Sequence, residues 1–205
     1  VGIGFDPDAD RIYVVLPGKG WVDGNTVAYA LAGITGAERI AASVDTSELI
    51  EKTGADIFYS RVGDVFVSKQ GIDEDVDLLV EPNGHYGFPD FCWYNSGILA
   101  GAFIASYLGR FRELVEEAPE YHTVRKDVQV SSSEKKDKKK MNEAKKHAAK
   151  NYGIKSTLDG VKFGDKSFSA LVRPSGTGDK IRIVVNSRDE DKAEKVGEEL
   201  YSLLS

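Results

Sequence analysis

The segment Val1-Gly-Ile-Gly-Phe-Asp6-Pro-Asp8-Ala-Asp10-Arg11 organises this chain. Its first five residues are mostly apolar and predict a short buried strand, and three aspartates follow at alternate positions. Carboxylates this close repel one another, and burying them without partners costs free energy. A divalent cation relieves the repulsion, and an all-oxygen site suits Mg²⁺ or Ca²⁺ better than Zn²⁺. The segment therefore predicts either a cation site or an acidic surface turn.

Two other motifs begin with aspartates in this spacing. An EF-hand loop requires glycine at its sixth position and glutamate at its twelfth. Counted from Asp6, those positions hold Arg11 and Pro17, which excludes the EF-hand. A phosphatase of the haloacid dehalogenase type resembles D-x-D-x-T/V after a strand. Asp10 stands where that motif has its small residue, so this interpretation is less favoured but stays open.

Length and composition describe an ordinary soluble protein. The 205 residues predict one large or two small domains. The net charge of −6 argues against nucleic-acid binding. We find no apolar run of membrane-spanning length and no signal peptide, and the single Cys92 has no internal disulfide partner. We therefore expect a cytoplasmic protein without a nucleic-acid or membrane partner. Because the first residue is Val1 rather than methionine, we also expect further residues upstream.

Strands alternate with helices up to about residue 118, which predicts an α/β domain. The later strands are expected at Arg11–Leu16, Arg39–Val44, Ala55–Val62 and Leu78–Val80. Helices are expected at Thr26–Ala32, at Ser47–Thr53 behind a Thr46 cap, at Ile98–Leu108 and at Phe111–Glu117, with a short helical or extended piece at Val65–Lys69.

The composition changes near Pro119, and a compact α+β unit is expected beyond it. Its predicted strands lie around Val124–Val130 and at Leu158–Phe163, Phe168–Val172 and Lys180–Asn186. The lysine-rich segment Glu134–Lys150 has an apolar stripe at helical spacing, formed by Met141, Ala144, Ala148 and Tyr152. This stripe predicts an amphipathic helix with solvated lysines rather than a nucleic-acid arm. A capping box at Ser187–Glu190 predicts the last helix.

Polar residues gather at four places, beyond what local structure requires. These are Asp6–Arg11, Arg61–Asp64, Glu81–His85 and Arg173–Lys180. The last combines an arginine, hydroxyl groups and glycine-rich backbone, which are the parts of a phosphate-binding loop. The same run also fits a plain hairpin turn.

Taken in order, these stretches resemble the α-D-phosphohexomutase family, the phosphoglucomutases and phosphomannomutases. In that family the metal loop looks like D-G-D-x-D-R, the sugar loop like G-E-x-S-G-H and the phosphate loop like R-x-S-G-T-E-P-x-I-R. The matching stretches here are Asp6–Arg11, Val80–His85 and Arg173–Arg182. Val62–Asp64 matches the family's V-G-D. Gly178 and Asp179 replace Glu-Pro, which makes this phosphate loop looser.

The resemblance implies roles for individual residues. Asp6, Asp8 and Asp10 would hold Mg²⁺, and Arg11 would add positive charge beside them. Glu81 and Asn83 would bind hydroxyls of a hexose phosphate. The non-reacting phosphate would be bound by Arg173, Ser175, Gly176 and Thr177. Asp64 and His85 would transfer or position protons. Asp45 is expected in an exposed loop instead.

The resemblance also implies a domain division and a missing part. Residues 1–22 would be the end of a metal-binding second domain, 23–118 a mixed α/β sugar-binding domain, and 119–205 a smaller α+β phosphate-binding domain with an antiparallel sheet and two helices. The family's catalytic phosphoserine lies in a motif like S-H-N-P, which is absent from this sequence. We therefore expect part of an isomerase that is inactive without serine-bearing N-terminal domains, from the same full-length chain or a separate one. A non-catalytic sugar-phosphate-binding module stays the alternative.

Overall fold

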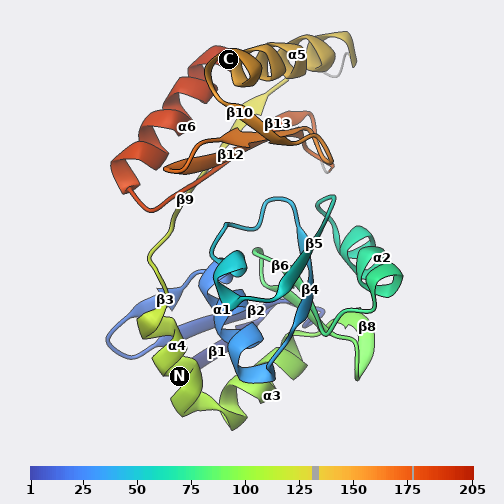
Figure 1. Cartoon of the computed structure of the whole chain (residues 1–205), viewed down its shortest axis with the longest axis vertical. Helices are drawn as coiled ribbons and strands as arrows, with labels where there is room; N and C mark the ends of the chain where they lie inside the picture. Colours follow the sequence, from blue (N-terminus) through green and yellow to red (C-terminus); the bar gives the residue numbers. More distant parts are fainter. Residues whose placement is uncertain (131–133, 177) are drawn as a thin grey trace. The chain divides into compact units, whose positions relative to one another are not determined.

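The computed structural model describes residues 1–130, 134–176 and 178–205. The chain divides into two compact units, Val1–Pro119 and Glu120–Ser205 (Figure 1). The predicted fold class is confirmed, because an α/β unit is followed by a smaller α+β unit with one antiparallel sheet and two helices. The domain boundaries after residues 22 and 118 stay predictions. None of the helices in the described ranges combines the length and hydropathy of a membrane span.

The first unit begins with a three-stranded antiparallel sheet, β1 (Gly2–Phe5), β2 (Ile12–Leu16) and β3 (Gly20–Val22). Alternate residues of β2 are buried and join the main core of the unit. The prediction that the first strand is buried is wrong, because Phe5 is 45% exposed. Among the described strands β1 pairs only with β2, so it is an edge strand with little covering it.

The central sheet of this unit has the strand order β5-β4-β6-β7-β8. Strands β4 (Arg39–Ser43), β5 (Asp56–Ser60) and β6 (Leu78–Glu81) are parallel, whereas β7 (His85–Phe88) and β8 (Cys92–Asn95) continue the sheet antiparallel. The carboxyl ends of parallel strands lie at one edge of a sheet, where α/β proteins commonly place their ligands. The β6–β7 turn, which contains the predicted sugar loop, lies at that edge.

Helices cover both faces of the central sheet (Figure 1). One face packs against α1 (Gly24–Thr35) and the 3₁₀ helix η1 (Ile50–Thr53), and α3 (Gly97–Ser106) and α4 (Leu108–Glu117) pack against α1. The other face packs against α2 (Asp64–Glu74). The period of two in each strand produces this arrangement, because successive side chains enter opposite cores.

Two local predictions in this unit were wrong, and a third was too short. The helical or extended piece expected at Val65–Lys69 is helical, but it belongs to the longer helix α2. The helix expected from Ser47 is only η1, and Thr46 does not cap it, because its first turn starts from Leu49 without a side-chain cap. Asp45 is half-buried rather than an exposed loop acid, since its Oδ1 accepts a hydrogen bond of 2.6 Å from Ser43 Oγ.

The second unit is one antiparallel sheet in the order β10-β11-β12-β13-β9. Its strands are β9 (His122–Gln129), β10 (Gly153–Ser156), β11 (Val161–Gly164), β12 (Phe168–Pro174) and β13 (Lys180–Ser187). The sequence missed β10, because its four residues are mostly exposed and carry no apolar alternation.

Helices α5 (Glu134–Asn151) and α6 (Glu190–Leu204) pack on this sheet. The predicted amphipathic α5 is confirmed, with Ala144 and Ala148 fully buried in the core. The predicted capping box is wrong. Ser187 belongs to β13, and the Asp189 side chain accepts the hydrogen bond from Lys192 N–H that caps α6.

Asp127 on β9 joins two cations of β13. Its carboxylate lies 2.6 Å from Lys180 Nζ and 3.0 Å from Arg182 Nε, and Arg182 is its direct cross-strand neighbour. The hydrogen bond from Arg182, helped by Lys180, lowers the pKa of Asp127 although partial burial opposes this shift. The folded state therefore favours the charged carboxylate.

We predict that Asp127→Asn destabilises the second unit by roughly 1 kcal/mol at pH 7, because a partly exposed ion pair contributes little more. Since the folded pKa is lowered, the contribution is present above the unfolded value of about 3.9 and is lost as the pH falls through the folded value. The difference from wild type should thus shrink below about pH 4. Hydrogen exchange of β13 amides measures the difference in the free energy of unfolding. The control is Asp179→Asn, at an exposed carboxylate. An undiminished difference at pH 3 would contradict the account.

Candidate functional site

The Asp6–Arg11 loop connects β1 to β2 and folds its three aspartates together. One carboxylate oxygen from each of Asp6, Asp8 and Asp10 lies within 4.8 Å of the other two. The loop turns at Ala9, which has a positive φ of 58° and donates its N–H to the Asp6 carbonyl oxygen at 3.1 Å. The local backbone thus brings three anionic oxygens to one point.

The donor atoms of this cluster fit a hard divalent cation. Asp6 Oδ2 and Asp10 Oδ1 are buried and form no hydrogen bond with the described residues. Arg11 Nε lies 2.6 Å from Asp6 Oδ2 and 3.6 Å from Asp10 Oδ1 as an ion pair. Burial raises the pKa of Asp6, but the hydrogen bonds and charge of Arg11 outweigh it and lower the pKa overall. Carboxylate oxygens held anionic in this way are ligands for Mg²⁺ or Ca²⁺.

The predicted sugar loop is fixed against the aspartate loop by backbone contacts. Ile12 N–H donates to the Gly84 carbonyl oxygen at 3.1 Å, and Arg11 pairs with His85 in an isolated β-bridge. Gly84 has a φ of 104°, and a Cβ there would lie 2.9 Å from the Ile12 carbonyl oxygen. Only glycine suits both the backbone conformation and the close approach.

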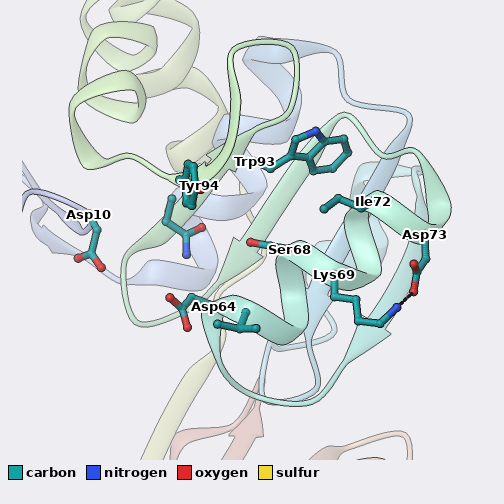
Figure 2. A pocket seen from close by; sticks show the side chains of 10 residues that line it. Asp10, Asp64, Ser68, Lys69, Ile72, Asp73, Trp93 and Tyr94 are labelled. Carbon is teal, nitrogen blue, oxygen red and sulfur yellow. Dashed lines mark hydrogen bonds and ion pairs between the residues drawn. The ribbon is translucent and has the colours of Figure 1, made fainter.

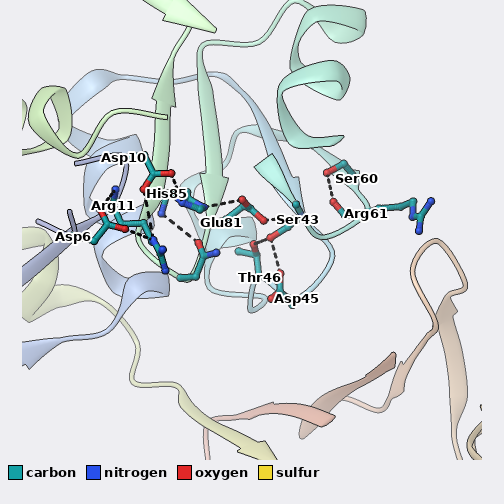
Figure 3. A network of polar contacts seen from close by, with 12 residues as sticks. Asp6, Asp10, Arg11, Ser43, Asp45, Thr46, Ser60, Arg61, Glu81 and His85 are labelled. Atoms are coloured by element: carbon teal, nitrogen blue, oxygen red, sulfur yellow. Dashed lines mark hydrogen bonds and ion pairs between the residues drawn. The ribbon is translucent and has the colours of Figure 1, made fainter. Parts of the chain in front are cut away.

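Side chains connect the same two loops (Figure 3). His85 Nε2 lies 3.1 Å from Asp10 Oδ2, and His85 Nδ1 lies 3.1 Å from Glu81 Oε2. The second oxygen of Glu81 accepts the N–H of Gly63 at 2.9 Å. Burial lowers the pKa of His85, but the hydrogen bond to Glu81 and the charges of Glu81 and Asp10 outweigh it and raise the pKa. The predicted residues Asp10, Glu81 and His85 are therefore in one hydrogen-bonded chain.

The start of α3 supports the aspartate loop, a contact that sequence reasoning missed. Gly97 N–H donates to the Ala9 carbonyl oxygen at 3.0 Å, and Ser96 Oγ accepts the N–H of Leu99 as the helix cap. A Cβ at Gly97 would lie 2.5 Å from the Arg11 carbonyl oxygen. Ser96-Gly97 before an apolar run is a helix-start signal, but nothing local shows what it touches.

Asp64 shares a cavity with Asp10. This cavity, of about 680 Å³, lies beside α2 and β8 and includes Trp93, Tyr94 and Asn95 in its wall (Figure 2). Asp64 is exposed in the first turn of α2. Asn83 is also exposed, and its Oδ1 accepts the His85 N–H at 3.3 Å.

The predicted phosphate loop belongs to the second unit. Arg173 Nη1 lies 3.4 Å from Asp159 and donates to the Pro174 carbonyl oxygen at 3.2 Å, while its buried Nε makes no hydrogen bond with the described residues. Ser175 N–H donates to the Lys180 carbonyl oxygen at 2.8 Å and closes the turn. Gly176 is exposed, and Thr177 lies outside the described residues.

Two models of one protein family match most of this chain. The family model described as "Phosphoglucomutase/phosphomannomutase, alpha/beta/alpha domain III" matches residues 23–122. The model for the C-terminal domain of the same family matches residues 128–203. The chain belongs to the phosphoglucomutase/phosphomannomutase family, the α-D-phosphohexomutases.

Curated relatives match along the whole chain. A probable phosphoglucosamine mutase of Methanobrevibacter smithii is 32% identical over 100% of this chain and 47% of its own length. A phosphoglucosamine mutase of Methanococcus maripaludis is 29% identical over 100% of this chain and 48% of its own length. The chain therefore spans about half the length of the curated relatives it matches.

Solved structures share the fold. A phosphoglucomutase/phosphomannomutase family protein from Burkholderia thailandensis superposes with a TM-score of 0.79 at 18% identity, covering 99% of this chain and 46% of that chain. A putative phosphomannomutase from Thermus thermophilus gives a TM-score of 0.73 at 21% identity, over 98% of this chain and 45% of that chain.

We predict that Gly97→Ala destabilises the first unit by about 1–3 kcal/mol, because its Cβ has to displace the backbone of the aspartate loop. The matched control is Gly109→Ala in α4, where a Cβ meets nothing within 4 Å. That control should be neutral or stabilise by about 0.5–1 kcal/mol, since alanine favours a helix over glycine. Urea unfolding followed by tryptophan fluorescence reports this unit, because Trp21 and Trp93 both lie in it. Equal stabilities for the two variants would refute the tight contact.

Proposed function

We propose that this chain supplies the metal, sugar and phosphate sites of a phosphohexomutase, which moves a phosphoryl group between C1 and C6 of a hexose phosphate. The observation that carries the proposal is the aspartate cluster. Its three oxygens within 4.8 Å of one another are linked through His85 to Glu81 in the sugar loop.

Asp6, Asp8 and Asp10 would hold Mg²⁺ in this proposal. When bound, the ion supplies positive charge that offsets the negative charge of the transferring phosphoryl group. Arg11 holds Asp6 in its charged form, as the 2.6 Å ion pair supports. Its side chain is 41% exposed, so it can also face a phosphate.

Other residues of the first unit would orient the sugar and its protons. The exposed amide of Asn83 can hydrogen-bond sugar hydroxyls, because its Oδ1 accepts the His85 N–H and its –NH₂ group offers two donors. His85 is placed beside Asp10 and is a candidate for proton transfer or positioning. Asp64, across the shared cavity from Asp10, is a second candidate.

The phosphate that does not react would bind to the second unit. Arg173, Ser175, Gly176 and Thr177 are its proposed ligands. Arg173 supports this role, because its guanidinium, which lies 3.4 Å from Asp159, can offer N–H groups to phosphate oxygens.

The serine-bearing domains are the proposed partner of this chain, because the sequence contains no motif like S-H-N-P. We propose glucosamine phosphate as the first substrate to test, since the relatives reported above are named phosphoglucosamine mutases. The sugar-loop residues would contact hydroxyls that glucose, mannose and glucosamine phosphates share, so all three belong in the test.

We predict no mutase turnover by the purified chain and measurable turnover when a serine-bearing half is added in trans or the longer protein is expressed. A coupled assay with the three hexose phosphates measures both. Turnover by the chain alone would overturn the need for a partner. Phosphate release without interconversion of the sugar phosphates would favour a phosphatase instead, and ligand binding without any rescue would favour a non-catalytic module.

We predict that Asp8→Asn weakens Mg²⁺ or Mn²⁺ binding at least tenfold while the fold stays intact. Asp8 is the exposed member of the cluster, so its loss removes a charged ligand without breaking an internal contact. Calorimetric titration measures the dissociation constant. Glu116→Gln, at an exposed site on α4, removes the same charge away from the cluster and should change nothing. Unchanged affinity in Asp8→Asn would exclude this metal site.

A further inference from the structure

Glu81 is almost fully buried and has a hydrogen-bond partner on each carboxylate oxygen. It ends β6, is 2% exposed, and both of its carboxylate oxygens already have partners in the chain. Oε1 accepts the Gly63 N–H at 2.9 Å, and Oε2 lies 3.1 Å from His85 Nδ1. A buried carboxylate with two such contacts is held in one rotamer.

His85 connects the fixed carboxylate of Glu81 to the carboxylate of Asp10. Its side chain is 13% exposed, and its second ring nitrogen lies 3.1 Å from Asp10 Oδ2. The other oxygen, Asp10 Oδ1, is buried and makes no hydrogen bond with the described residues. The two oxygens of Asp10 therefore have different surroundings, since Oδ2 contacts His85 and Oδ1 lies 3.6 Å from Arg11 Nε.

We propose that Glu81 is a positioning residue of the metal site, which acts through His85 to orient the carboxylate of Asp10. The inference rests on the proposed function insofar as the aspartate cluster binds a metal. Carboxylate–histidine pairs that orient a metal ligand are a common way to fix its geometry, and their loss typically weakens metal binding about 10–100-fold.

The Gly63 contact extends the same arrangement to α2. Because Glu81 Oε1 accepts the N–H of the residue directly before Asp64, one buried side chain holds both the start of α2 and the ring of His85. Asp10 and Asp64, which line one cavity, are thus positioned from a common point.

Two substitutions separate the effect of the length of the Glu81 side chain from the effect of its charge. Glu81→Asp keeps the charge but withdraws the carboxylate from His85 by one methylene. Glu81→Gln removes the charge but keeps the length, and its amide can still accept the Gly63 N–H and donate to His85 Nδ1. His85→Phe removes both ring nitrogens and keeps most of the ring volume. Glu116→Asp, at an exposed site on α4, is the matched control.

The experiment measures the dissociation constant of Mn²⁺ for each variant of the 205-residue chain by electron paramagnetic resonance. We expect Glu81→Asp and His85→Phe to weaken binding about 10–100-fold, and Glu81→Gln and Glu116→Asp to change it little. The double variant Glu81→Asp/His85→Phe should bind no more weakly than His85→Phe, because Glu81 acts through the histidine. Circular dichroism checks that each variant folds.

Three results would overturn the inference. The first is unchanged affinity in Glu81→Asp, which leaves Glu81 without a part in metal binding. The second is weak binding in Glu81→Gln with normal binding in Glu81→Asp, which shows that charge rather than position matters. The third is multiplied losses in the double variant, which shows that Glu81 does not act through His85.

A metal-free measurement distinguishes failure of this inference from failure of the proposed function. If the wild-type chain binds no Mn²⁺, the proposed metal site fails. The positioning role is then decided by nuclear magnetic resonance. Asp10→Asn should shift the His85 ring proton resonances in the wild-type background and have no such effect in the Glu81→Asp background. Equal shifts in both backgrounds would overturn the positioning role.

Discussion

Mutual repulsion among Asp6, Asp8 and Asp10 is the constraint on which the first unit depends. Three carboxylate oxygens within 4.8 Å of one another are unfavourable unless positive charge or hydrogen-bond donors face them. Arg11 supplies the charge from within the loop, and His85 supplies a ring nitrogen from the neighbouring sheet. What these two leave unsatisfied is a set of oxygens suited to a divalent cation.

The surrounding fold holds this unfavourable arrangement in place through close backbone contacts. Gly84 in the β6–β7 turn and Gly97 at the start of α3 approach the aspartate loop so closely that neither has room for a Cβ. The backbone of the aspartate loop is therefore held between the β6–β7 turn and the start of α3. Strain and repulsion at such a site persist only when the surrounding structure fixes the backbone, which is common where proteins bind ligands.

Local patterns in the sequence predicted the class of fold and the aspartate cluster, because alternation, helical spacing and neighbouring aspartates are local properties. The exposure of Phe5 was not predictable in this way, since burial depends on which strands lie beside β1. Strands β7 and β8 are too short and too interrupted to show a period. For α6, Ser187 and Asp189 both offered a cap, and only the extent of β13 decided between them.

Contacts between distant segments were likewise not predictable at the candidate site. Glu81 and His85 were singled out as residues, but the sequence does not reveal that they bond to each other and to Asp10. The hydrogen bonds of the Gly63 and Gly97 amides were not predicted, because a sequence does not show which backbone N–H groups donate to another segment. Contacts between segments more than ten residues apart came only from the structure.

The most direct test of the account is anomalous diffraction from crystals of this chain soaked with Mn²⁺. The account predicts one peak bound by Asp6, Asp8 and Asp10, at about 2.0–2.3 Å from an oxygen of each. A peak elsewhere, or no peak at the cluster in crystals that keep the loop folded, would contradict the claim that these aspartates form a metal site.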